Sequence, residues 1–97
     1  MDKKLYKIIS VTDKEGNIKQ DAIDQMKEIC ADMVGEVVFP ELIKAGTRFC
    51  LLWNNDSGRM MRTSLIESFD ESNLELEVVT RNSVYTLRDV SDEKVME

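Results

Sequence analysis

The side chains that usually carry out catalysis are missing from this chain or lack the partners they need. The sequence contains no histidine, which is the usual general base near neutral pH and the commonest metal ligand. Thr63 and Ser64 offer hydroxyl nucleophiles, but no base accompanies them. None of the nineteen Asp and Glu residues lies in an apolar sequence context that would raise its pKa, as a catalytic acid requires. We therefore predict that the protein is not an enzyme.

The sequence also predicts no cofactor and no metal site. Its four glycines form neither a P-loop nor a G-x-G-x-x-G pattern. The Asn54–Gly58 segment is rich in oxygen atoms but lacks the other ligand positions of an EF-hand loop, which favours a hairpin turn. Cys30 and Cys50 form no C-x-x-C pair. They are predicted to be buried free thiols in a reducing cytoplasm, since a disulfide would need their Cα atoms within about 7 Å.

Arginine is the residue type in this chain that is best suited to binding a partner. All five arginines lie in the strand-rich half, whereas seven of the eight lysines precede residue 45. The planar guanidinium group anchors carboxylates, phosphates and aromatic rings better than the lysine ammonium group does. If the strands pair in sequence order, four arginines could converge into a stripe that binds nucleic acid; otherwise they are surface residues paired with interleaved carboxylates. The four arginines are Arg48, Arg62, Arg81 and Arg88, and the carboxylates are Glu67, Glu75, Glu77 and Asp89.

Trp53 is the other candidate interaction residue. It follows an apolar segment and precedes the polar Asn54–Gly58 loop, so its ring is either half-buried in the core or an exposed anchor for a partner. The net charge of −6 disfavours nucleic-acid binding by a generally basic surface. An acidic surface that imitates nucleic acid is a further alternative. Its carboxylates would come from the predicted helix, at Asp21, Asp24, Glu28 and Asp32.

Alternating residues from Arg59 to Val90 predict three antiparallel strands joined by two tight turns. The turns fall at Asp70–Asn73 and at Arg81–Ser83. A further strand is predicted at Thr47–Asn54, with Phe49, Leu51 and Trp53 on one face and Arg48, Cys50 and Leu52 on the other. In the three later strands the residues predicted to face inward are Met61, Thr63, Leu65, Phe69, Leu74, Leu76 and Val78, with Glu75 and Glu77 facing water.

The N-terminal part of the chain predicts one strand and one helix. Leu5–Thr12 is rich in β-branched and aromatic residues and favours a strand, although its apolar spacing also fits a short helix. From about Lys19 to Val34, apolar residues recur every three or four positions, which predicts an amphipathic helix. Asn17 and Gln20 are spaced as a capping box, and Gly35 is placed to end the helix in a left-handed conformation.

These elements predict one α+β domain that spans residues 1–97. The N-terminal strand and the helix, at about 19–34, pack on a four- to five-stranded antiparallel meander at about 46–90. The meander is predicted to close into a small SH3-like barrel with the helix across one opening, and an open sheet backed by the helix is the alternative. Between helix and meander, Val37–Phe39 favours an extended segment, Pro40 ends it, and Glu41–Lys44 fits one helical turn. Residues 91–97 are acidic and predicted to fray.

The location predicted from the sequence is the cytoplasm. No apolar run approaches the roughly 18 residues that a membrane span needs, so no membrane association is predicted. The N-terminal segment has basic residues but no apolar stretch and no small-residue cleavage site, so a secretory signal is not predicted either.

Two short motifs resemble a pattern found in other proteins. Thr63-Ser64-Leu65-Ile66, followed by Thr80-Arg81-Asn82-Ser83-Val84-Tyr85, is similar to the T-S-x-[V/I] and T-x-N-S-x-Y pattern of short uncharacterised bacterial proteins of Firmicutes and their mobile elements. The resemblance covers about Gly46 to Leu87. It implies a small β-rich domain without an assigned activity, motif residues that maintain turns and strand pairing, and a role related to a mobile element or phage.

The function predicted from the sequence is that of a non-enzymatic interaction or regulatory module. It would bind a protein partner, or a second copy of itself, through an exposed strand edge or the surface around Trp53. The first alternative is a small β-barrel that binds nucleic acid through the four candidate arginines. The second is an acidic inhibitor, from a phage or mobile element, of an enzyme that binds nucleic acid.

Overall fold

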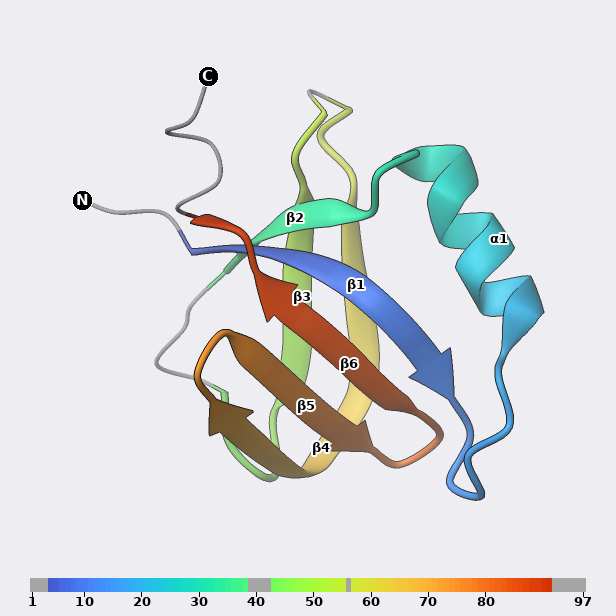
Figure 1. The fold of residues 1–97 in the computed structure, drawn as a ribbon, viewed down its shortest axis with the longest axis vertical. Coiled ribbons are helices and arrows are strands. Elements are labelled where there is room, and N and C mark those ends of the chain that lie inside the picture. Colours follow the sequence, from blue (N-terminus) through green and yellow to red (C-terminus); the bar gives the residue numbers. More distant parts are fainter. Residues whose placement is uncertain (1–3, 39–42, 56, 92–97) are drawn as a thin grey trace.

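The computed structural model describes residues 4–38, 43–55 and 57–91 (Figure 1). Its elements are β1 (Leu5–Thr12), α1 (Gln20–Ile29), β2 (Val34–Val37), β3 (Arg48–Trp53), β4 (Met60–Ser72), β5 (Glu75–Thr80) and β6 (Val84–Asp89). The six strands pair in sequence order, each antiparallel to the next, and β6 pairs with β1 to close a barrel. This confirms the predicted small α+β barrel, which is consistent with an SH3-like fold, and excludes the open sheet.

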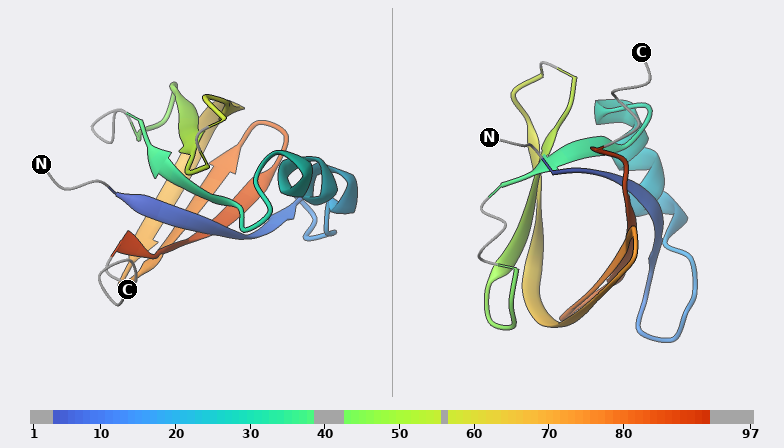
Figure 2. Two further views of the ribbon diagram at one scale, coloured as in Figure 1. Left: turned by 90° about the horizontal axis from the view of Figure 1, so that it is seen from above. Right: turned by 60° about the vertical axis from the view of Figure 1, so that its left-hand side comes forward.

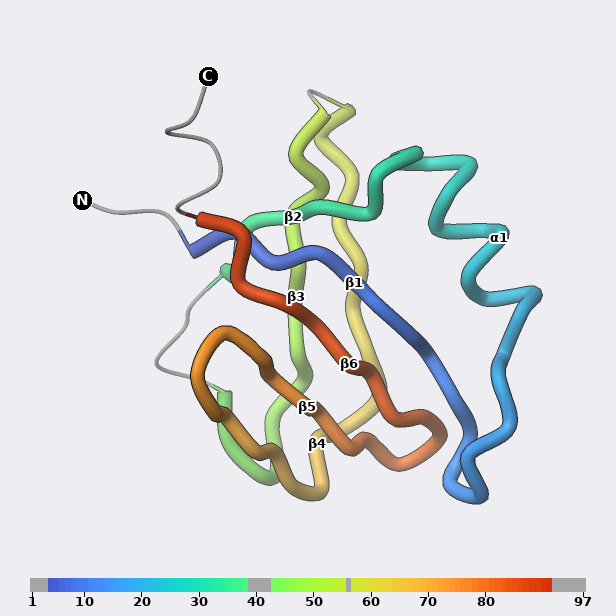
Figure 3. The backbone as a smooth tube through the Cα atoms, viewed as in Figure 1, coloured from blue at the N-terminus to red at the C-terminus, as the bar shows by residue number. Residues whose placement is uncertain are grey.

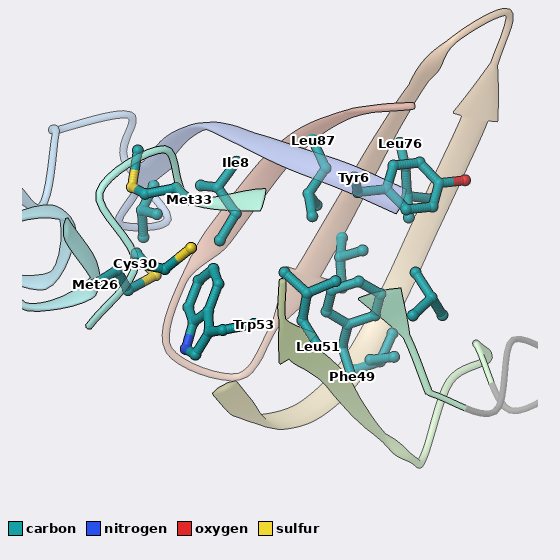
Figure 4. Packing of buried hydrophobic residues seen from close by; sticks show 14 residues of the cluster. Tyr6, Ile8, Met26, Cys30, Met33, Phe49, Leu51, Trp53, Leu76 and Leu87 are labelled. Carbon is teal, nitrogen blue, oxygen red and sulfur yellow. The ribbon is translucent and has the colours of Figure 1, made fainter. Parts of the chain in front are cut away.

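The strands wrap around one core, and α1 lies outside the ring of strands at one end (Figure 2). The chain trace shows the β3–β4 hairpin projecting past β2 (Figure 3). The core has two ends that differ in composition (Figure 4). Sulfur-containing side chains and an indole pack at the α1 end, whereas aromatic and aliphatic side chains fill the other. The first group is Met26, Cys30, Met33 and Trp53, and the second includes Tyr6, Phe49 and Leu76.

The strands with one wet face follow their predicted alternation. β1 has the predicted bounds. In β5, Leu76 and Val78 are buried while Glu75 and Glu77 are exposed. The turn predicted at Asp70–Asn73 is wrong in position, because β4 continues to Ser72 and the chain turns at Asn73 and Leu74. Leu74 therefore lies before β5 and is exposed, so its predicted inward orientation is also wrong. In β3, the predicted inner face of Phe49, Leu51 and Trp53 is buried.

β4 departs from simple alternation because it contains two bulges. From the pair Cys50–Arg62 to the pair Arg48–Leu65, β4 advances three residues while β3 advances two. From the pair Ile66–Thr80 to the pair Ser68–Val79, β4 advances two residues while β5 advances one. Each bulge moves the following side chains to the other face. As a result Ile66 is buried, whereas Leu65 is 41% exposed and Phe69 is 42% exposed, contrary to their predicted inward orientation.

The helix is shorter than predicted, and a sixth strand replaces its last part. α1 ends at Ile29, and Cys30 has extended backbone angles. Met33, with φ of 53°, is the left-handed residue that redirects the chain. Val34 and Gly35 then belong to β2, which pairs with both β1 and β3. The prediction that Gly35 ends the helix is therefore wrong.

The predicted capping box at the start of the helix is also absent. The residue before α1 is Lys19, and no side chain caps the helix there. The Asn17 side chain instead donates to the carboxylate of Asp13 at 3.1 Å, and the same carboxylate accepts the backbone N–H groups of Glu15 and Asn17. These bonds, chiefly those from Asn17, lower the pKa of Asp13. Asn17 thus stabilises the turn after β1 rather than the helix.

The C-terminal end of the described chain is attached to the barrel. Ser91, predicted to begin a frayed tail, accepts the backbone N–H of Leu5 through Oγ at 2.9 Å and donates its own N–H to Asp89. The rest of the predicted frayed tail, at 92–97, lies outside the described residues. Residues 39–42, which belong to the predicted extended segment and helical turn, lie outside them as well. α1, the helix of the described ranges, is not long and apolar enough to cross a membrane.

Candidate functional site

Trp53 belongs to the core. Its side chain is 3% exposed, which excludes its predicted alternative role as an exposed anchor. The indole lies at the end of β3 close to Met26 and Cys30, where α1 covers the barrel (Figure 4). Its ring also forms the floor of an open groove, so the surface around Trp53, rather than Trp53 itself, is the accessible feature.

This groove lies between α1 and the β3–β4 hairpin and encloses about 180 Å³. One wall is a face of α1, made by residues at helical spacing, namely Ala22, Gln25, Met26 and Ile29. The other wall and the floor come from the barrel, through Trp53, Met60, Met61 and Tyr85. Met60 is 50% exposed at the rim. The groove is therefore lined mainly by apolar and sulfur-containing groups.

Both walls of the groove are held in place by hydrogen bonds between elements. The side-chain amide of Asn55, from the β3–β4 loop, donates to the last carbonyl of α1, at Ile29, over 2.5 Å. The backbone N–H of Lys19, just before α1, donates to Val11 of β1 at 2.9 Å. The helix stripe with Met26 and Met33 is predicted from the sequence to be core, with a docking face as the alternative. The adjacent Met60 and Met61, which follow the only tryptophan across a short polar loop, were the available signal for a groove.

The four candidate arginines do not share one face. Arg62 lies directly opposite Cys50, and Arg48 lies opposite Leu65, on the outer side of β3 and β4. The backbone N–H of Arg81 donates to the Leu65 carbonyl at 3.0 Å, which places it next to this pair. The fourth residue, Arg88, lies opposite Lys7 and Glu75, on β6.

The interleaved carboxylates do not neutralise the three grouped arginines. Glu67 pairs with Lys14 at 2.6 Å, and Asp89 pairs with Lys4 at 3.5 Å. No ion pair joins Arg48, Arg62 or Arg81 to another residue within 4–38, 43–55 and 57–91. The Arg48 guanidinium instead donates to the Thr63 carbonyl at 3.0 Å.

The hydroxyl groups of the recognised motifs hold turns and bulges. Thr63 Oγ1 accepts the backbone N–H of Phe49 at 3.1 Å and donates to the Ser64 carbonyl at 2.7 Å, within the first bulge of β4. Thr80 Oγ1 accepts the N–H of Ser83 and donates to its carbonyl, closing the β5–β6 turn. Thr63 and Thr80 are buried. Each of these hydroxyls accepts one hydrogen bond and donates another within the fold, so both have a structural role.

The thiols and helix carboxylates form no cluster in the described chain. Cys30 and Cys50 are free thiols, as predicted. Cys30 is buried, and burial raises the pKa of its thiol. Cys50 is half-buried, whereas it was predicted to be buried. Asp32 accepts the Cys30 thiol and the Val34 N–H. Within the described ranges no group of three His, Cys, Asp or Glu residues could hold a metal ion. The remaining predicted helix carboxylates, Asp21, Asp24 and Glu28, are exposed on α1.

A second cavity, of about 300 Å³, opens at the end of the barrel away from α1. Tyr6 lies in its wall, and its hydroxyl donates weakly to the Glu71 carboxylate at 3.5 Å. Burial, followed by the negative charges of Glu71 and Asp89, raises the pKa of Tyr6 from 10.0 to about 12. The folded barrel therefore holds the phenol proton more tightly than the unfolded chain does.

Stability is expected to fall at high pH because of Tyr6. The phenol proton of Tyr6 contributes fully to the free energy of unfolding below pH 10.0, the pKa of tyrosine in the unfolded chain. This contribution is lost as the pH rises through about 12, the pKa of Tyr6 in the folded barrel. Urea midpoints measured at intervals across this range should fall less steeply for Tyr6→Phe than for the wild type. Tyr85, whose pKa is also raised by burial, is present in both proteins, so its effect cancels in the comparison. Equal slopes would contradict the assignment to Tyr6.

The chain was compared with known proteins by sequence and by structure. No protein-family model, curated protein or solved structure matches it.

Proposed function

We propose that the protein is a non-enzymatic interaction module that binds a protein partner in the groove between α1 and the β3–β4 hairpin. The observation that carries this proposal is the exposure of Met60, 50% accessible beside a floor made by the buried ring of Trp53. A large apolar side chain at the rim of an apolar groove gains free energy when a partner covers it. Methionine also adapts its shape to the bound surface.

The cytoplasmic location and the role related to a mobile element or phage are parts of the same proposal. Cys30 and Cys50 are free thiols, which suits a reducing compartment. The resemblance of the Thr63–Ile66 and Thr80–Tyr85 motifs to mobile-element proteins supports the biological context. The hydroxyl bonds of Thr63 and Thr80 agree with the structural role that the resemblance implies for these motifs.

The proposal is tested with a random peptide library displayed on phage and selected on the purified wild-type protein. Synthetic copies of the selected peptides are then titrated against Met60→Glu and Leu65→Glu. Both positions are exposed apolar residues of β4, at 50% and 41%, but only Met60 lines the groove. We expect Met60→Glu to weaken binding at least about tenfold, or about 1.4 kcal/mol, and Leu65→Glu to leave it within about twofold.

Trp53 provides a second readout in this test, because it is the only tryptophan and forms the groove floor. Its emission should change when a peptide binds to the wild type and to Leu65→Glu. Failure to select any peptide, or selection only of peptides that bind Met60→Glu as well as the wild type, would overturn the proposal.

Nucleic-acid binding is the second candidate function. It is favoured by the grouping of Arg48, Arg62 and Arg81 around Leu65 without an ion pair to another described residue. A fluorescent single-stranded oligonucleotide provides the probe. On this alternative, affinity falls steeply with salt concentration, and Arg62→Ala reduces both the affinity and the salt slope. Arg88→Ala, on a different part of the barrel, serves as the control.

A further inference from the structure

One half of β4 has an edge without a strand partner. Met60–Leu65 pair with β3, and Ile66–Ser72 pair with β5. The opposite edge of the first half, from Met60 to Ser64, pairs with no strand of the described chain. This segment lies between β3 and α1 (Figure 1), and two of its residues, Met60 and Met61, line the groove. The open edge therefore borders the groove.

The hydrogen-bonding groups of this edge point away from β3. Trp53 donates its backbone N–H to the Arg59 carbonyl at 3.0 Å, which marks these two residues as a hydrogen-bonded pair of the β3–β4 ladder. Such pairs alternate with non-bonded pairs in antiparallel strands, and the register sets Leu52 opposite Met60 and Cys50 opposite Arg62. The N–H and C=O groups of Met60 and Arg62 are thus directed to the α1 side.

We propose that the partner enters the groove as an extended strand that pairs with the open edge of β4 at Met60–Ser64. This inference rests on the proposed function and specifies the conformation of the bound segment. A strand edge is complementary to extended backbone, because its donors and acceptors recur with the spacing of a strand. A bound helix would leave the same groups unpaired.

A second copy of this chain suits the edge less well than a peptide does. Two-fold pairing centred on Arg62, the middle of the edge, would set this arginine opposite its own copy, and like charges directly opposite each other are destabilising. α1 also forms the facing wall of the groove, which admits a single chain more readily than another barrel. The inference therefore commits to a segment of a different protein.

The alternation of a strand predicts the composition of this segment. Side chains on one face would contact the floor at Met26, Trp53 and Met61, so they should be apolar. Those on the other face would lie in water beside Arg62 and the exposed carboxylates Asp21 and Glu28 of α1, so they should be polar. We infer a ligand that alternates apolar and polar residues.

The test uses a capped nonapeptide of alternating valine and serine and two N-methylated versions of it, one methylated at every valine and the other at every serine. Within a strand, these two sets of amides lie on opposite edges. Methylation of one set should abolish binding, since it removes the donors that face β4, whereas methylation of the other should change affinity by less than about threefold. The serine set faces β4 if the strands are antiparallel, and the valine set if they are parallel.

Binding is followed by amide chemical shifts of the ¹⁵N-labelled protein, where Met60 and Arg62 should shift most and exchange more slowly with solvent. Binding that is lost in Met60→Glu but is equally sensitive to both methylation patterns would overturn the strand and leave the groove as a docking site. Binding unaffected by Met60→Glu would overturn the groove as well. Absence of any shift at Met60 and Arg62 at about 1 mM peptide, the weakest useful affinity, would also overturn the strand.

Discussion

Leu76→Asp is expected to unfold the barrel. Leu76 is the second residue of β5, is 1% exposed, and lies opposite Leu87 of β6 and Glu71 of β4. A carboxylate at this position would lose its hydration in the core, which costs several kcal/mol. A domain of this size has only about 5–15 kcal/mol of stability in total. Far-ultraviolet circular dichroism and a red shift of the Trp53 emission measure the loss.

Glu77→Lys is the matched control, because it changes the charge of the next outward-facing residue in the same strand. Glu77 is exposed and lies directly opposite Asp70. Replacing one of two facing carboxylates by a lysine should leave stability unchanged or raise it by up to about 1 kcal/mol. Glu75 is less suitable, since it lies opposite Arg88. A folded Leu76→Asp variant with wild-type stability, or an unfolded Glu77→Lys, would mean that the two faces of β5 are exchanged.

The strands of the barrel could be predicted from the sequence where one face of the strand is exposed to solvent. β3 and β5 each show a period of two in residues that the structure buries in alternation, and β1 was predicted from its β-branched and aromatic residues. The bulges of β4 could not be predicted in this way, because a bulge is a property of two paired strands. Leu65 and Ile66 are both apolar, and only the register with Arg48 decides which of them is buried.

The boundary between α1 and β2 was beyond the sequence for a related reason. Cys30, Met33 and Val34 continue the helical spacing of the residues before them, so the local pattern extends the helix. The same residues also satisfy a turn and a strand, and pairing of β2 with β1 and β3 decides between the two. These partners are far away in the sequence, and tertiary pairing outweighs a local helical preference.

The residue types of the candidate site were visible in the sequence, but their placement was not. Trp53 and the arginines were identified from their chemistry alone. Whether an arginine joins the group around Leu65, as Arg62 does, or lies elsewhere, as Arg88 does, depends on strand register. The groove depends further on where α1 lies against β4, and neither element carries a local pattern that specifies the other.

Gly35→Ala is expected to destabilise the barrel by about 3 kcal/mol, at the upper end for overpacking, and to lower the melting temperature by about 10–20 °C. Gly35 lies in β2 between Tyr6 of β1 and Trp53 of β3. A methyl group there would lie 2.6 Å from Cγ of Leu51 and 2.9 Å from the carbonyl oxygen of Leu52. Leu51 is completely buried, and the carbonyl belongs to the backbone of β3, so neither can move without disturbing the strands.

The double variant Gly35→Ala/Leu51→Ala separates these two contacts. Truncating Leu51 at Cβ removes Cγ and Cδ2, the side-chain atoms that the new methyl group would meet, but leaves the Leu52 carbonyl in place, so part of the loss should be recovered relative to the sum of the two single variants. Thermal melts of the four proteins give this coupling. Trp53, directly opposite Gly35, should report the same disturbance as a shift in emission. An unchanged melting temperature for Gly35→Ala would mean that β2 and β3 lie farther apart than the structure shows. The position of Trp53 at the end of β3, and with it the floor of the groove, would then be wrong.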